Sequence, residues 1–258
     1  MLDADELLKT GVYKPQYQQE KDYIEELFLE KLFGCCNSLV FKGGTALSKF
    51  YGSARFSDDL NFSTKAQNGG KDISTRIDRM LGLLYEEMPA RLLRKISTAG
   101  MLKYELSIRG PLFSTLGKYQ HLKIEIGMNE SVLEPVSVFR RNPQYKDLRP
   151  YLALVMDEKE IMAEKVVALL YRRNIKARDL YDIYFMALKN TELKIGLVDM
   201  KMKERGHTFT SEKFYKRISD IGAIWDRELF RLLPEGAFVS YGVVRDAVTE
   251  YFETAGLL

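Results

Sequence analysis

The sequence predicts an α/β domain followed by an all-helical domain, and three observations support this fold class. In the first 155 residues, several short segments alternate apolar and polar side chains, as strands do. Segments with apolar residues at helical spacing lie between them. After Asp157 the strand patterns disappear and only helical patterns follow. We therefore expect two domains, residues 1–155 and residues 156–258.

The expected first domain combines strands with flanking helices. In residues 101–109, Tyr104, Leu106 and Ile108 alternate with polar residues, and residues 121–127 alternate in the same way. Apolar residues at helical spacing and the following Gly34 predict an amphipathic helix at 16–33. The remaining elements are strands at 38–42, 56–63 and 152–156, helices at 45–51 and 72–95, and a turn at Asn68-Gly69-Gly70.

The expected second domain contains helices only. Apolar periodicity predicts five of them, with breaks at Gly196, Gly206, Pro234 and Gly242. They span residues 157–173, 177–189, 192–204, 211–231 and 240–255.

Composition and charge limit the class of protein. The chain has 258 residues, 46% hydrophobic and 29% charged, with a net charge of +3 that permits a polyanionic partner. No apolar stretch approaches the roughly 20 residues that span a bilayer. The first residues are acidic and show no signal peptide, so we expect a cytoplasmic protein without a membrane partner.

Cysteine and histidine are too few and too scattered for several kinds of active site. The adjacent Cys35 and Cys36 are expected to serve packing. His121 and His207 lie far apart and have no His or Cys partner at ligand spacing. This argues against zinc hydrolases, histidine-aspartate phosphohydrolases and histidine-dependent nucleases.

A glycine pair separates the strand expected at 38–42 from the helix that follows it. Gly43 and Gly44 have no Cβ, so their backbone amides can approach a phosphate, and the helix N-terminus adds its positive end. Thr45 can donate its hydroxyl. The spacing matches neither the P-loop nor the dinucleotide fingerprint. A tight turn would explain the pair equally well on its own.

The strand expected at 56–63 carries carboxylate and amide oxygens on one face. Asp59 and Asn61 share this face with Ser57, whereas Leu60 and Phe62 define the buried face. Glu125 lies on the polar face of another expected strand. If the two strands are neighbours, Asp59, Asn61 and Glu125 converge as a set of oxygen ligands that suits Mg²⁺.

Two blocks of the sequence resemble a known family. Lys42-Gly43-Gly44-Thr45-Ala46-Leu47, followed by the segment from Arg55 to Phe62, looks like the signature of AbiEii/AbiGii-type nucleotidyltransferase-like toxins. These toxins belong to the DNA polymerase beta nucleotidyltransferase superfamily. The segments 160–169 and 178–182 agree with the same family. The resemblance covers roughly residues 20–190.

The resemblance implies a mixed-sheet nucleotidyltransferase domain joined to a helical C-terminal domain. It implies metal-dependent transfer of a nucleotide from an NTP to an acceptor such as tRNA or another RNA, with Mg²⁺ or Mn²⁺ as cofactor. It also implies a toxin with a cognate antitoxin.

The resemblance also implies roles for individual residues. Gly43, Gly44, Thr45 and Ser57 would contact the nucleotide, and Asp59, Asn61 and Glu125 would hold the metal. Asp59, Lys165 and Asp179 would be catalytic, with Lys165 and Arg178 also at the NTP and with Arg178 and Asp179 lining the cleft.

The sequence alone leaves other interpretations for the second block. The basic run from Arg172 to Arg178 is typical of a solvated surface. Asp182 is either part of the site or a helix-surface or capping residue.

Asn61 stands where the family pattern favours a second aspartate. Asparagine keeps an oxygen ligand but lacks the negative charge, which weakens the field on a divalent cation. In a regular strand Asp58 points to the opposite face and does not replace it. Two hypotheses follow: an active nucleotidyltransferase, or a catalytically weakened module that binds an NTP or a nucleic acid.

Overall fold

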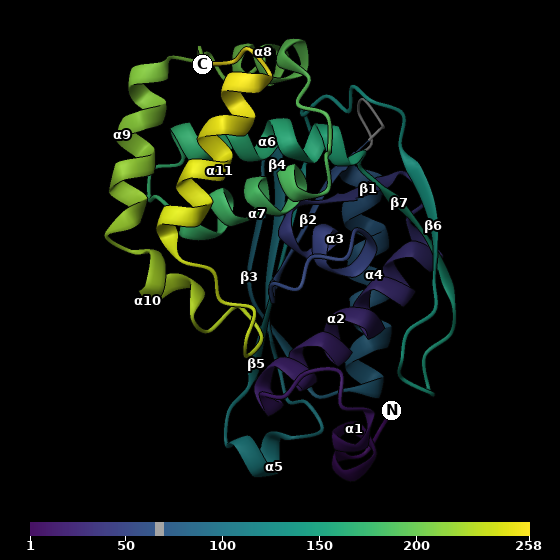
Figure 1. Cartoon of the computed structure of the whole chain (residues 1–258). Coiled ribbons are helices and arrows are strands. Elements are labelled where there is room, and N and C mark those ends of the chain that lie inside the picture. Colours follow the sequence, from purple (N-terminus) through teal and green to yellow (C-terminus); the bar gives the residue numbers. More distant parts are fainter. Residues whose placement is uncertain (65–69) are drawn as a thin grey trace. The chain divides into compact units, whose positions relative to one another are not determined.

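The chain folds into two compact units. The computed structural model describes residues 1–64 and 70–258, with the side chains of residues 70 and 71 left out (Figure 1). The first unit comprises Met1–Thr45, Asp58–Val132 and Val136–Val155. The second comprises Ala46–Ser57, Leu133–Pro135 and Met156–Leu258.

A seven-stranded mixed sheet forms the centre of the first unit. Its order is β3-β4-β5-β2-β1-β7-β6, with β1 parallel to β7, β2 parallel to β5 and all other pairs antiparallel. The strands are β1 (Leu39–Lys42), β2 (Asp59–Thr64), β3 (Ala90–Ser97), β4 (Met101–Ile108), β5 (Gln120–Gly127), β6 (Ser137–Arg141) and β7 (Tyr151–Val155). The expected α/β class with a mixed sheet is confirmed.

Alternating side chains bury one face of this sheet. Leu60, Phe62, Tyr104 and Ile124 are inaccessible to solvent, which confirms the faces predicted for three strands. Helix α2 (Gln16–Cys35) contacts β5 and β7, and α4 (Gly70–Glu87) contacts α2 and β3. Burial of these side chains supplies the main driving force for folding of this unit.

Helix α2 is buried more completely than an amphipathic helix would be. Its polar residues Glu20, Asp22 and Glu26 are buried together with its apolar ones. Each has a partner from elsewhere in the same unit: Gln120 for Glu20, Tyr145 for Asp22, and Arg141 for Glu26. The periodicity identified the helix correctly, but these distant partners were not visible in it.

The helix expected at 72–95 is too long. Helix α4 ends at Glu87, and Ala90–Ser97 forms the edge strand β3 instead. Pro89 explains the break, because proline cannot donate to a helical ladder and disfavours helical backbone in the residue before it. Of the turn expected at Asn68-Gly69-Gly70, Asn68 and Gly69 lie outside the described residues, and Gly70 begins α4.

Several smaller elements differ from expectation. Strand β2 begins at Asp59 rather than at residue 56, so Ser57 and Asp58 precede it. Strand β6 and the helices α1 (Ala4–Thr10) and α5 (Phe113–Leu116) were not predicted. Helix α1 begins with a capping box in which Asp3 and Glu6 bond reciprocally to backbone amides, a signal that the sequence did carry.

Helices make up most of the second unit. Helix α3 (Gly43–Phe50) begins in the first unit and continues into the second. The other described helices of the second unit are α6 (Glu158–Tyr171), α7 (Ala177–Leu188), α8 (Ile195–Lys203), α9 (Ser211–Gly222), α10 (Trp225–Leu229) and α11 (Tyr241–Thr254). Four of the five expected C-terminal helices are confirmed, and the one expected at 211–231 is divided into α9 and α10. The breaks expected at Gly196 and Gly242 are wrong, because both residues lie inside helices. No described helix combines the length and the apolar character needed to cross a membrane.

Candidate functional site

The three expected metal ligands lie on one face of the sheet. Strands β2 and β5 are parallel neighbours, and Asn61 stands directly beside Glu125 in their register. Asp59 lies two residues before Asn61 on the same face, beside Lys123. The predicted convergence required the two strands to be neighbours, and they are.

A cross-strand row of polar residues runs through Asn61. Lys42 of β1, Asn61 of β2, Glu125 of β5 and Lys103 of β4 are successive partners in the register. The Lys103 ammonium contacts a Glu125 oxygen at 2.8 Å, and this bond raises the pKa of Lys103. Each end of the row thus carries a lysine, and Glu125 is neutralised in part by one of them.

For Mg²⁺ these residues would form an incomplete ligand set. Within the described residues, no three His, Cys, Asp or Glu side chains are grouped closely enough to hold a metal ion. Mg²⁺ commonly takes only one or two carboxylates and fills its other positions with water and substrate phosphate. Asp59, Glu125 and the amide oxygen of Asn61 are chemically suited to that role.

The glycine pair forms the junction between β1 and α3. Helix α3 follows β1 without an intervening loop, and Gly43 at its start has φ +77°. A Cβ at Gly43 would lie 3.4 Å from the Asn61 amide nitrogen. The left-handed backbone explains why glycine is favoured there.

Thr45 already uses its hydroxyl proton within the protein. The buried Thr45 hydroxyl donates to the Asp59 carbonyl at 2.7 Å and so joins the start of α3 to the start of β2. A hydroxyl has only one proton, so donation to a phosphate would require this bond to break.

Lys21 of α2 is a charged neighbour of Asp59 that was not predicted. It is buried on α2, and its ammonium donates to the His121 carbonyl. Burial lowers the pKa of Lys21, while the negative charges of Glu25, Asp58 and Asp59 act in the opposite direction. Nothing in the helical periodicity distinguishes Lys21 from a surface lysine.

In the second unit, Lys165 and two aspartates form a buried ionic cluster. The Lys165 ammonium lies 3.0 Å from Asp179 on one side and 2.7 Å from Asp182 on the other. Lys165 comes from α6, and both aspartates come from α7. Asp182 is inaccessible to solvent, so the interpretation of Asp182 as a surface or capping residue is wrong.

Arg55 completes this cluster and was not predicted as a site residue. Its Nε and Nη2 each donate to a different Asp182 oxygen at 2.9 Å. Burial by itself would raise the pKa of Asp182, but the charges of Arg55 and Lys165 outweigh it and hold that pKa below its usual range. Burial alone would lower the pKa of Arg55, but the negative charge of Asp182 raises it above its usual value. The sequence signal for Arg55 is its place at the start of the segment from Arg55 to Phe62, which resembles the family signature.

The remaining predicted residues of the second unit lie near this cluster in the chain. Arg172 contacts Asp179 at 2.9 Å, so this member of the basic run is not merely solvated. Arg178 precedes Asp179 on α7 and is half-buried. Ser57 is also half-buried, in the segment that precedes β2. The expected site residues therefore divide between the sheet face and the helical cluster.

Comparison with protein families decides the relationship. The family model described as "Nucleotidyl transferase AbiEii toxin, Type IV TA system" matches residues 27–239. The chain belongs to this AbiEii family. It is accordingly a nucleotidyltransferase of the toxin type, and a type IV toxin–antitoxin system implies an antitoxin partner and a nucleotide substrate.

Two solved structures share the fold of this AbiEii family member. JHP933 from Helicobacter pylori matches with 20% identity and a TM-score of 0.56, covering 95% of this chain and 92% of the other. A candidate nucleotidyltransferase from H. pylori matches with 19% identity, the same TM-score and 95% coverage of both chains. Among curated proteins, none matches.

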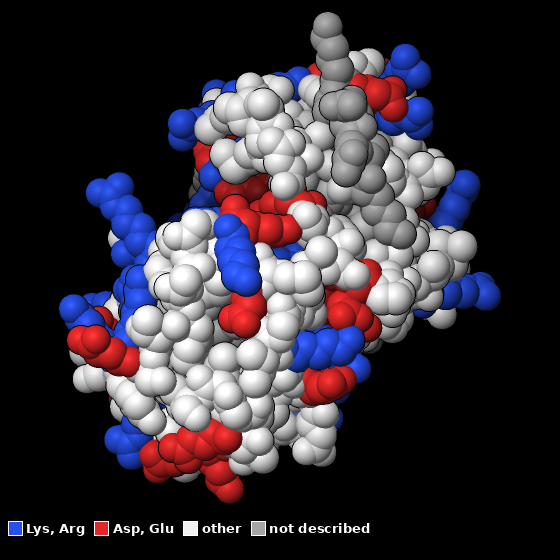
Figure 2. Space-filling model, turned by 90° about the horizontal axis from the view of Figure 1, so that it is seen from above, with Lys and Arg blue, Asp and Glu red and all other residues white. Residues whose placement is uncertain are grey.

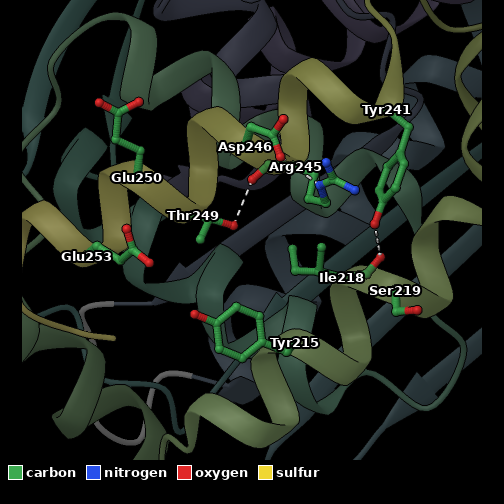
Figure 3. A pocket seen from close by; sticks show the side chains of 9 residues that line it. All are labelled: Tyr215, Ile218, Ser219, Tyr241, Arg245, Asp246, Thr249, Glu250 and Glu253. Carbon is green, nitrogen blue, oxygen red and sulfur yellow. Dashed lines mark hydrogen bonds and ion pairs between the residues drawn. The ribbon is translucent and has the colours of Figure 1, made fainter.

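A groove elsewhere on the helical unit of this AbiEii protein does not suit an NTP. Side chains from α9 and α11 line it, and its volume is about 530 Å³ (Figure 3). Arg245 is paired with Asp246 at 2.7 Å, and Glu250 and Glu253 add further negative charge. The groove contains none of the predicted site residues, and its acidic lining would repel a triphosphate.

Proposed function

We propose that this AbiEii-family nucleotidyltransferase uses a divalent cation, Mg²⁺ or Mn²⁺, to transfer a nucleotide from an NTP to an RNA such as tRNA. The observation that carries the proposal is the register of β2 and β5. It places Asp59, Asn61 and Glu125 on one face of the sheet, and the glycine junction approaches Asn61 from β1. We place the protein in the cytoplasm, where NTPs, RNA and an antitoxin would meet it.

On this account the sheet face would receive the triphosphate. Asp59 and Glu125, helped by the Asn61 amide oxygen, would hold the cation. When bound, the cation would offset the negative charge that develops on the phosphates. The backbone at Gly43 and Gly44, with the N-terminus of α3, would donate to phosphate oxygens.

The helical cluster would supply positive charge with a fixed orientation. Lys165 and Arg178 are the proposed phosphate contacts of the second unit, with Ser57 as a polar contact. The buried Asp179 and Asp182 hold the Lys165 ammonium between them, so its position is set before any ligand arrives. Preorganised charges of this kind stabilise developing negative charge without a reorganisation cost.

An RNA acceptor is supported by local positive charge. Arg172 and Arg173 are exposed at the end of α6, in the basic run that leads into α7. On the face seen in Figure 2, blue and red side chains are interspersed among the described residues, and neither sign forms an extended patch. We therefore expect RNA to be held by a short basic segment.

A second candidate function is binding without catalysis. Two features favour it: Asn61 carries no charge, and Lys103 neutralises part of the Glu125 carboxylate. Both reduce the field on a divalent cation. The substitution Asn61→Asp separates the candidates, because a restored carboxylate would produce transfer activity in a protein that otherwise only binds.

Transfer of label from each of the four α-labelled NTPs to total RNA tests the proposal. The wild-type protein is expected to label RNA with Mg²⁺ or Mn²⁺, and EDTA is expected to abolish the signal. Label that persists in EDTA would contradict the metal dependence. Absence of label with all four NTPs, together with activity of Asn61→Asp, would favour the binding module.

A further inference from the structure

A glutamate outside the predicted site folds back onto the same sheet face. The Glu130 carboxylate contacts the Lys42 ammonium and accepts a hydrogen bond from the Ser63 hydroxyl at 3.0 Å. It also lies over Gly127, where a Cβ would come within 2.2 Å of its oxygen. Ser63 and Gly127 are partners in the β2–β5 register, immediately beside the row that contains Asn61. The missing side chain at Gly127 is what admits Glu130.

Lys42 is placed where a phosphate-binding cation would be useful. It is the last residue of β1, directly before Gly43, and it stands opposite Asn61 in the register. Its side chain is 9% exposed. An ammonium buried to this degree is costly without an anionic partner, so some anion must accompany it.

Glu130 is the more accessible member of this pair. Its side chain is 33% exposed, and it belongs to the irregular segment between β5 and β6. Glu130 itself lies outside the described strands and helices. A triphosphate carries more negative charge than one carboxylate and could take its place beside Lys42.

We propose that Lys42 binds the polyphosphate of the NTP and that Glu130 is an internal anion which occupies Lys42 until the nucleotide displaces it. The proposal rests on the proposed function, because it adds a phosphate contact to the same sheet face. Glu130 then lowers the affinity for nucleotide and keeps the buried lysine paired when no nucleotide is bound.

The direction in which Glu130→Gln changes the affinity for nucleotide distinguishes this exchange from a fixed structural pair. Glu130→Gln keeps the size and the Ser63 contact but removes the competing charge. Displacement predicts tighter binding, with a Kd for a non-hydrolysable NTP analogue lowered about tenfold. A structural pair predicts weaker binding, because Lys42 would lose the group that positions it.

The experiment measures Kd by calorimetry for the NTP analogue and for inorganic tripolyphosphate, each with and without Mg²⁺. Lys42→Met is expected to raise both Kd values about tenfold or more, because a charge-assisted contact is lost. Ser63→Ala loosens Glu130 without changing any charge and is expected to lower Kd by a smaller factor. Glu105→Gln removes a carboxylate from β4 on the same face and serves as the matched control for net charge.

The outcomes separate this inference from the proposed function. If the wild type binds the analogue but Lys42→Met has no effect, or if Glu130→Gln weakens binding, the inference is wrong and the proposed function stands. An equal gain in Glu105→Gln would also overturn it, since net charge alone would explain the shift. If neither probe binds any variant, both fail.

Discussion

The Arg55 guanidinium and the Asp182 carboxylate meet in a two-point contact between residues 127 positions apart in the chain, with both distances 2.9 Å. Arg55 is 2% exposed and Asp182 is 0% exposed. The same Asp182 carboxylate contacts Lys165, so Arg55 positions Lys165 through Asp182. This contact ties the segment before β2 to helix α7 within the helical unit.

Breaking this pair should destabilise the protein strongly. Asp182→Asn leaves Arg55 buried without its counter-charge, and we expect the free energy of unfolding to fall by about 3–5 kcal/mol. Urea denaturation monitored by circular dichroism measures this free energy. Asp246→Asn removes one partner of an exposed pair and should leave the midpoint unchanged. A loss in Asp182→Asn no larger than in this control would contradict the structural role of the pair.

The contribution of Asp182 should depend on pH in the acid range. Its folded-state pKa lies below the ordinary value of 3.8, so the charged form is favoured by folding. The resulting stability is fully present well above pH 3.8 and is lost as the pH falls below 3.8 through the folded pKa. The difference in unfolding free energy between wild type and Asp182→Asn should therefore shrink as the pH falls below 3.8. A difference that grows in acid would have the wrong sign.

Gly43→Ala should impair both stability and nucleotide binding. The φ of +77° costs an L-residue about 1–2 kcal/mol, and the new methyl group would contact the Asn61 side chain. Thermal unfolding and NTP titration measure the two effects. Gly196→Ala is the matched control: its Cβ meets nothing within 4 Å inside α8, so it should stabilise the protein by about 0.5–1 kcal/mol. If both substitutions behaved alike, the conformational requirement at Gly43 would be refuted.

The two cysteines should differ sharply in reactivity. A hydrogen bond from the Cys36 thiol, aided by Arg76 and opposed by burial, lowers the pKa of Cys35 to about 7. The same interaction and burial raise the pKa of Cys36. Alkylation by iodoacetamide, read by mass spectrometry, should modify Cys35 with a half-maximal rate near pH 7 and spare Cys36. Cys36→Ala should move that midpoint upward, whereas faster modification of Cys36 in the wild type would contradict the assignment.

Local patterns in the sequence were sufficient for much of the sheet unit. Alternation in residues 101–109 and 121–127 identified the buried faces, because strand periodicity depends on neighbouring residues only. Alternation in residues 56–63 placed Asp59 and Asn61 on one face. The structure supplies the register, in which Glu125 is the partner of Asn61. The metal and nucleotide roles of these residues stay predictions.

Interactions between distant residues could not be predicted. The adjacent apolar residues Leu92 and Leu93 are compatible with a helix as well as with a strand. Among the residues between α4 and β3, Pro89 was the signal that the helix had ended. Arg55 and Asp182 carry no local sign that they form a pair, and neither do Lys42 and Glu130. Buried charges reveal their partners only when the fold brings them together.

Asp59 is the residue on which the proposed chemistry depends most directly. The decisive measurement compares incorporation of labelled NTP into RNA by wild type, Asp59→Ala and Asp58→Ala, each shown to be folded by circular dichroism. Asp58 precedes β2, and its substitution makes the same change in net charge, so it is the matched control. We expect Asp59→Ala to reduce the rate by about 10² or more and Asp58→Ala to retain most of it. Equal rates in Asp59→Ala and wild type would contradict the account.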